Sequence, residues 1–75
     1  MRASAWTSGD NSWFRRDIGD GAASVTVSRN RTGGWSWVVG TSTGVVKSGD
    51  GYSTANKAKL EADKFLATAY GVMAA

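Results

Sequence analysis

The stretch "AASVTVSRNRTGGWSWVVGT" (residues 22–41) decides the fold, because two strand-like runs flank a short polar loop. Apolar and polar residues alternate in the first run and in the start of the second, as in a half-buried strand. Closing "NRTGG" as a hairpin loop sets Val27 opposite Trp37 and Val25 opposite Val39. Cross-strand neighbours share a face, so we predict an apolar face centred on these four side chains.

A strand-like run on each side extends this hairpin. Residues 12–18 precede it and are separated from it by "GDG", while residues 45–48 follow the turn "STG". A second "GDG", residues 49–51, is also predicted to be a turn. Folding residues 41–44 as a hairpin sets Val39 opposite Val46. The predicted apolar face then comprises Ala23, Val25, Val27, Trp35, Trp37, Val39 and Val46.

A helix is predicted over residues 53–70. Ser53 or Thr54 can cap its first amide groups, and Gly71 is a natural stop. One face gathers small and apolar residues at helical spacing: Ala58, Ala62, Phe65, Leu66 and Ala69. We therefore predict an α+β fold, a three- to four-stranded antiparallel β-sheet meander followed by one C-terminal α-helix packed on one face (ββββα).

The core is predicted to form between this helix and the tryptophans. A chain of 75 residues is one small domain and needs most of its large apolar side chains inside. We expect Trp35 and Trp37 to pack against Phe65 and Leu66 rather than to serve as a ligand platform. Residues 1–11 are predicted to be irregular, with the sheet at 12–48 and the helix at 53–70.

The first strand contains a misfit. Phe14 and Ile18 mark the side of this strand that should face the core, but Arg16 lies on the same side. An edge position, a bulge or an extended aliphatic stem would each tolerate an arginine there. The sequence leaves these three explanations open.

The opposite, open sheet face is the predicted binding surface. It should carry Trp13, Arg15, Thr26, Ser36 and Lys47, a mixture of one aromatic residue, cations and short hydroxyl donors that is typical of recognition surfaces. The alternative for the aromatic residue is that it packs with Trp6 under the amino-terminal segment. A second candidate surface is the outer helix face formed by Leu60, Lys64 and Ala67.

Catalysis is not expected. The chain has no His and no Cys, which removes two common bases and nucleophiles. Asp10, Asp20 and Asp50 lie in predicted glycine turns, while Glu61 and Asp63 lie on a helix beside lysines, where a solvated charged face is expected. No metal site and no cofactor are predicted.

Charge and composition point to a binding function. Nine Lys and Arg exceed six Asp and Glu, giving +3. We expect a nucleic acid or a nucleic-acid-handling protein complex as the partner; the alternative is a protein–protein inhibitor or assembly factor that touches no nucleic acid. A homodimer is possible through the open face or an edge strand. Without an apolar run long enough for a signal peptide or membrane span, a cytoplasmic protein with no membrane partner is expected.

Residues 34–66 resemble the small YegP-like domains of unknown function. The shared elements are an aromatic-bearing strand with Trp35 and Trp37, a turn at Thr43-Gly44, a strand ending near "GYS" and a helix from Thr54. The family's usual Asn before the turn glycine is replaced by Thr43. The resemblance implies a fold and no activity. In size and character the chain is also similar to small phage-encoded inhibitors such as anti-CRISPR proteins, which block a host complex.

Overall fold

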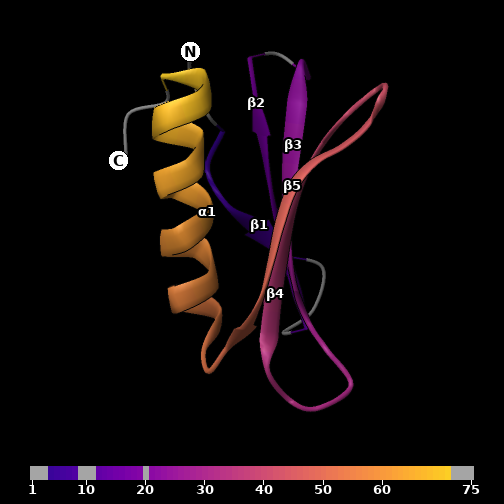
Figure 1. Cartoon of the computed structure of the whole chain (residues 1–75), viewed down its shortest axis with the longest axis vertical. Helices are drawn as coiled ribbons and strands as arrows, with labels where there is room; N and C mark the ends of the chain where they lie inside the picture. The colour runs from indigo at the N-terminus through magenta and orange to yellow at the C-terminus, as the bar shows by residue number, and fades with distance from the viewer. Residues whose placement is uncertain (1–3, 9–11, 20, 72–75) are drawn as a thin grey trace.

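A computed structural model describes residues 4–8, 12–19 and 21–71 of the chain. It is an antiparallel sheet followed by one carboxyl-terminal helix, so the predicted fold class is confirmed (Figure 1). The strands are β1 (Thr7–Ser8), β2 (Trp13–Ile18), β3 (Ala23–Arg29), β4 (Trp35–Thr41) and β5 (Gly44–Tyr52), and the helix is α1 (Ala55–Tyr70).

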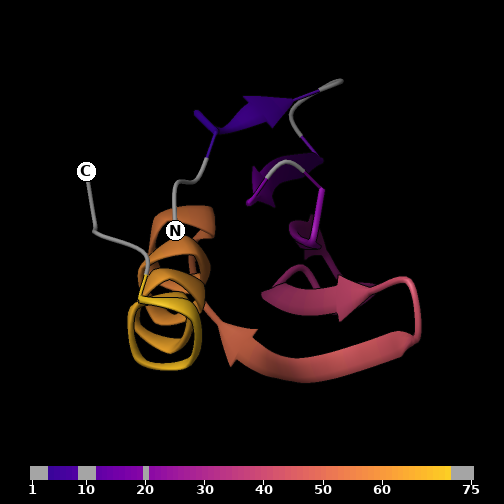
Figure 2. The same ribbon diagram turned by 90° about the horizontal axis from the view of Figure 1, so that it is seen from above.

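The five strands form a meander, with sheet order β1-β2-β3-β4-β5 and every neighbouring pair antiparallel. The helix covers one face, and the sheet curves towards it (Figure 2). The sheet is open, with β1 and β5 as its edges, because these two strands do not pair with each other. The other face has no covering element among the described residues.

The core lies between the curved sheet and α1. Val25, Val27 and Val39 are fully buried on the middle strands, and Leu66 is fully buried on the helix. Trp37 is 4% exposed and packs against Phe65, with ring centroids 5.9 Å apart. Trp35 is half-buried against Phe14, at 6.0 Å. The prediction is confirmed for Trp37. Trp35 lies on the same side of the sheet, but it is half-buried and its aromatic contact is with Phe14.

The central hairpin has the predicted register. Val27 pairs with Trp37 and Val25 with Val39. Asn30 organises the loop, because its side-chain oxygen accepts hydrogen bonds from the backbone amides of Thr32 (3.1 Å) and Gly34 (2.9 Å). An Asn side chain that replaces backbone acceptors in this way stabilises a tight turn, which explains why the loop holds the register.

The register predicted for β5 is wrong beyond its first residues. Gly40 pairs with Val45 as expected, but Val39 pairs with Lys47, so Val46 is an extra residue in a β-bulge. Val46 is 46% exposed and does not belong to the apolar face. The shift moves Lys47 from the open face to the helix-side face.

The second "GDG" segment is not a turn. Residues 49–51 lie inside β5, which continues to Tyr52 through a second bulge. Gly49 is opposite Trp37, whose indole Nε1 donates a hydrogen bond to the Tyr52 hydroxyl at 3.1 Å. A methyl group at residue 49 would lie 2.8 Å from both indole Cε2 and that hydroxyl oxygen. The lack of a side chain at Gly49 therefore leaves room for the Trp37 indole to lie against β5.

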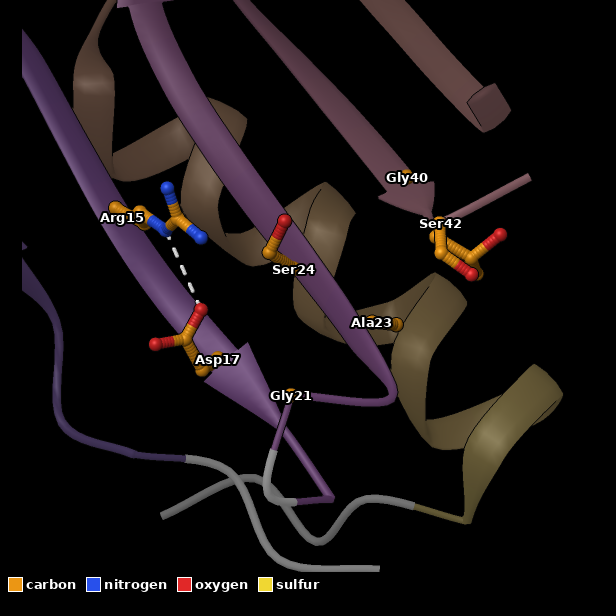
Figure 3. Close-up of a pocket in the computed structure, with 8 residues that line it drawn as sticks. Arg15, Asp17, Gly21, Ala23, Ser24, Gly40 and Ser42 are labelled. Atoms are coloured by element: carbon orange, nitrogen blue, oxygen red, sulfur yellow. Dashed lines mark hydrogen bonds and ion pairs between the residues drawn. The ribbon is translucent and has the colours of Figure 1, made fainter. Parts of the chain in front are cut away.

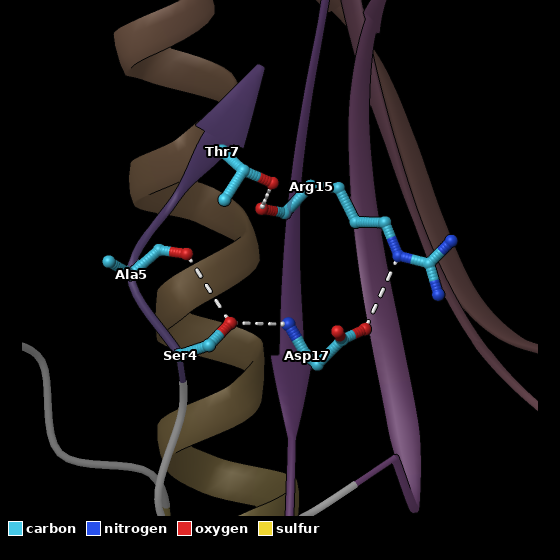
Figure 4. A network of polar contacts seen from close by, with 5 residues as sticks. All are labelled: Ser4, Ala5, Thr7, Arg15 and Asp17. Carbon is cyan, nitrogen blue, oxygen red and sulfur yellow. Dashed lines mark hydrogen bonds and ion pairs between the residues drawn. The ribbon is translucent and has the colours of Figure 1, made fainter. Parts of the chain in front are cut away.

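The amino-terminal segment is more ordered than predicted. Thr7–Ser8 form the edge strand β1 on β2, and the Ser4 backbone amide donates to the Asp17 carbonyl oxygen at 2.8 Å. The Ser4 hydroxyl accepts from the Asp17 backbone amide at 3.0 Å (Figure 4). Within residues 1–11, only 4–8 are described. The sheet therefore extends past the predicted limits of 12–48 at both ends.

Arg16 is buried, its register with β3 is unbroken and its side chain is 8% exposed, so neither a bulge nor an aliphatic stem that reaches solvent explains it. β2 is an inner strand, and Arg16 forms an ion pair with Asp63 of α1 at 2.9 Å. Its Nε also donates to the Ser4 carbonyl oxygen at 2.7 Å, and its guanidinium lies over the Trp6 ring. Asp63 was expected on a solvated face; instead it neutralises the arginine.

The helix ends are as predicted. Thr54 is the N-cap and accepts from the Lys57 amide at 3.2 Å, while Gly71 ends the helix in the left-handed conformation at φ 64°. Ala58, Ala62 and Leu66 are buried, but Ala69, predicted on the same face, is exposed. In the part of the chain described, no helix has the length and apolar character needed to cross a bilayer.

Candidate binding surfaces

The open sheet face brings together four of the five predicted residues. Arg15 pairs with Thr26, and Trp13 and Ser36 both pair with Ser28. Lys47 is the exception, because the bulge at Val46 places it opposite Val39 on the helix-side face. We refer to the surface of β2, β3 and β4 that carries Trp13, Arg15, Thr26 and Ser36 as the open face.

Trp13 does not pack with Trp6. Trp13 is 38% exposed on the open face, whereas Trp6 packs against the core on the helix side, between the Arg16 guanidinium at 5.0 Å and the Lys59 ammonium at 5.5 Å. Val38 is exposed on the open face to nearly the same extent as Trp13, at 37%. The two side chains give this otherwise small and polar surface some apolar area.

The open face carries no net charge. Its two described charged residues, Arg15 and Asp17, form an ion pair at 3.3 Å and are each about half exposed (Figure 4). The same pair borders a shallow depression of about 290 Å³ near the β2–β3 and β4–β5 turns (Figure 3). The other lining residues are Gly21, Ala23, Ser24, Gly40, Thr41 and Ser42.

Because Arg15 is paired, the depression offers a ligand no unpaired charge among the described residues. It has backbone groups and hydroxyls instead. The depression belongs to the open face and does not by itself indicate a ligand class.

The second predicted surface is exposed, but it has few features that would bind a partner. Leu60 is 61% exposed, Ala67 is exposed, and the Lys64 side chain forms an ion pair with Glu61 at 3.3 Å. Single exposed apolar residues are common on soluble domains. This outer helix face therefore has less to offer a partner than the open face does.

The free positive charge lies elsewhere, at an end of the molecule that sequence reasoning did not identify. Three ion pairs neutralise Arg15, Arg16 and Lys64. The other described cations, Arg29, Arg31, Lys47, Lys57 and Lys59, make no ion pair with a described residue.

Four of these five cations share one end of the fold. Arg29 ends β3 and Arg31 lies in the β3–β4 loop, while Lys57 and Lys59 lie in the first two turns of α1. Figure 1 shows the β3–β4 loop and the start of the helix at the same end of the molecule. We call this region the loop end. The cations were visible in "SRNRTGG" and "NKAKL", but only the topology shows that the two segments lie at the same end of the fold.

Aromatic rings lie beside these cations. In the last cross-strand row, Arg29 pairs with Trp35 and Trp35 with Tyr52. Trp35 packs against Phe14, and the Lys59 ammonium lies 3.6 Å from the centroid of the Phe14 ring. Phe14, Trp35 and Tyr52 are all half-buried, so none of these residues is fully enclosed in the core.

One acid, Asp50, also lies at the loop end. Its carboxylate accepts from the Asn30 side-chain amide at 2.8 Å and from the Gly51 amide at 2.7 Å. It therefore holds the β3–β4 loop against the bulge in β5. The described charge at this end remains positive, four cations against one carboxylate.

The described acids have structural roles. Asp17, Glu61 and Asp63 are in ion pairs, and Asp50 bonds to the hairpin loop. Asp10 and Asp20, which were predicted in turns, lie outside the described residues. Within the described ranges, no group of three or more potential metal ligands occurs.

Comparisons of the chain with protein-family profiles, with curated proteins and with solved structures find no match. The resemblance to YegP-like domains and the similarity to phage-encoded inhibitors remain predictions from sequence.

Proposed function

We propose that the chain is a small non-enzymatic domain that binds nucleic acid, and that the loop end supplies the phosphate contacts. The observation that carries the proposal is the separation of charge. The ion pairs neutralise the open face and the middle of the helix, whereas Arg29, Arg31, Lys57 and Lys59 stay free at one end.

Clustered cations suit phosphates for a simple reason. Each cation that meets a phosphate releases counterions, and the gain in affinity grows with the number of such contacts. Two of the four side chains are arginines, whose planar guanidinium can bind a phosphate through two hydrogen bonds. The lack of His and Cys, together with the structural roles of the described acids, supports a binding rather than a catalytic function.

Two double variants of equal charge test the proposal. Arg29→Gln/Arg31→Gln removes two charges from the loop end, and Lys47→Gln/Lys64→Gln removes two from elsewhere. We expect the first to weaken binding of a labelled DNA oligonucleotide by roughly tenfold or more at low salt. The slope of log affinity against log salt should also fall by about 2, one unit for each lost phosphate contact.

The second double variant should bind nearly as the parent does. Equal losses in both variants would mean that net charge alone governs binding and that the loop end is not a site. Absence of any salt-dependent binding by the parent protein would refute the proposed function.

The open face favours a second function, binding to a protein. It is uncharged overall, and Trp13 and Val38 expose apolar surface on it. Aromatic residues contribute strongly to protein interfaces, so Trp13→Ala should weaken such a complex. A protein complex that resists nuclease and high salt, and that is lost with Trp13→Ala but kept with Arg29→Gln/Arg31→Gln, would support this alternative.

A further inference from the structure

We infer that the nucleic acid recognised at the loop end is single-stranded, with a base stacking on the aromatic cluster of Phe14, Trp35 and Tyr52. This inference rests on the proposed function and specifies its ligand class. The observation behind it is that half-buried rings and unpaired cations occupy the same end of the fold.

The register shows how closely the rings and cations are associated. Arg29, Trp35 and Tyr52 are direct cross-strand neighbours on three adjacent strands. Side chains directly opposite each other in antiparallel strands have Cβ atoms about 4.5–5.5 Å apart. A base resting on Trp35 would therefore have a guanidinium within reach of its phosphate.

Phe14 and Lys59 extend this arrangement on the side of the helix. Phe14 lies 6.0 Å from Trp35, and the Lys59 ammonium is held 3.6 Å from the Phe14 ring. A cation fixed over a ring is already positioned and loses little conformational freedom when a phosphate arrives. The aromatic cluster thus has two cations beside it, Arg29 next to Trp35 and Lys59 over Phe14.

This combination favours a single strand over a duplex. Bases in a duplex are stacked on each other and cannot reach an aromatic side chain, whereas bases of a single strand can. Single-strand-binding proteins combine a positive surface that follows the backbone with aromatic rings on which bases stack. Stacking is tolerant of sequence because every base has a π face, so little sequence preference is expected.

The aromatic cluster is also tied to the rigid part of the protein. The Tyr52 hydroxyl accepts a hydrogen bond from the buried Trp37 indole, and Asn30 bonds to Asp50 across the loop end. A stacking surface held by core contacts does not need to order itself on binding. The backbone of the β3–β4 loop, which carries Arg31, is likewise held by the Asn30 hydrogen bonds.

The experiment compares a labelled oligothymidine with a duplex of the same length by fluorescence anisotropy, at one salt concentration. We expect the parent protein to bind the single strand at least about tenfold more tightly. Trp35→Leu keeps apolar bulk but removes the ring, and it should lower single-strand affinity by about tenfold while leaving duplex affinity unchanged. Trp35→Phe, which keeps an aromatic ring, should retain most of the affinity.

Trp13→Leu is the matched control, because it removes a tryptophan of the open face and should change neither affinity. Thermal unfolding followed by circular dichroism checks that each variant is folded at the assay temperature. A variant of Trp35 that fails to fold is replaced by Tyr52→Leu, for which the same loss of single-strand affinity is expected.

The outcomes separate the two proposals. Equal binding of single strand and duplex, with loss only in Arg29→Gln/Arg31→Gln, would overturn the stacking inference and leave the proposed function standing. Equal competition by polyglutamate would also overturn the inference, because it would show that any polyanion suffices. No binding to either nucleic acid would refute both proposals.

Discussion

Arg15 and Arg16 are neighbours in the chain, and each pairs with an aspartate, yet their pairs lie in opposite environments. The Arg16 side chain is 8% exposed and its partner Asp63 is 21% exposed, under the helix. The Arg15 side chain is 55% exposed and Asp17 is 52% exposed, on the open face. Consecutive side chains of a strand lie on opposite faces of the sheet. The charge of Arg16 is therefore buried under the helix, and the charge of the adjacent Arg15 is exposed on the open face.

The two environments separate the side of the sheet that stabilises the fold from the side that is free to bind a partner. The helix side contains the buried core and a buried ion pair, so substitutions there should cost several kcal/mol. The open face contains small polar residues and an exposed pair, so substitutions there should cost little. Substitutions on each side of the sheet should therefore differ widely in their effect on the free energy of unfolding.

The largest effect is expected for Trp37→Ala. The indole is 4% exposed, packs against Phe65 and bonds to Tyr52, so its loss removes apolar contact and leaves a cavity. We expect a loss of about 3–5 kcal/mol in the free energy of unfolding, enough to unfold a small domain of ordinary stability. Urea unfolding with Val45→Ala as the control, at a site 70% exposed, measures the difference. A fully stable Trp37→Ala variant would mean that the core is not on the helix side.

The buried ion pair should give the next largest effect. Asp63→Ala leaves the Arg16 guanidinium buried without its carboxylate, at an expected cost of about 3 kcal/mol. The double change Arg16→Met/Asp63→Leu removes both charges and should recover most of that loss, because two apolar side chains need no compensation. If Asp63→Ala were as stable as the parent in urea unfolding, Arg16 would have to reach water or another partner.

Gly49→Ala tests the contact between β5 and the core. A methyl group there would lie 2.8 Å from the Tyr52 hydroxyl and the same distance from Trp37 Cε2. We expect a loss of about 1–3 kcal/mol from the forced movement of these rings. Gly40→Ala is the control on β4, where an added methyl group meets its nearest atom at 3.5 Å. Similar unfolding midpoints for both variants would contradict the close approach of the indole to β5.

The central hairpin was predictable because its register follows from one loop and an alternating pattern. The bulges of β5 were not, because the alternating pattern does not mark either extra residue. The bulge near Tyr52 accompanies the close approach of the Trp37 ring to Gly49, which only the packed core determines. Strand β1 was not predicted because it has no alternating apolar residues. Hydrogen bonds from Ser4 and Thr7 to β2 hold this segment in place instead. The misfit of Arg16 was visible, but its partner lies 47 residues away in the chain.

The loop end was missed for a related reason. Arg29 and Lys57 are far apart in sequence and lie at the same end of the fold only because β5 returns the chain to the end where β3 stops. Sequence reasoning assigned Arg15 and Lys47 to one binding face by extrapolating a register through β5. One inserted residue at Val46 was enough to move the lysine to the other side of the sheet.

The smallest effect on stability is expected for Arg15→Ala and Asp17→Ala on the open face. Both side chains are more than half exposed, so solvent screens their attraction, and each change should alter the free energy of unfolding by no more than about 0.5 kcal/mol. A double-mutant cycle in urea unfolding isolates the coupling between them, which should be similarly small. A coupling above about 1 kcal/mol would show that the pair is shielded from water. Repeating the cycle at higher protein concentration identifies the cause, because a coupling that grows with concentration would mean that a second copy of the chain covers the open face.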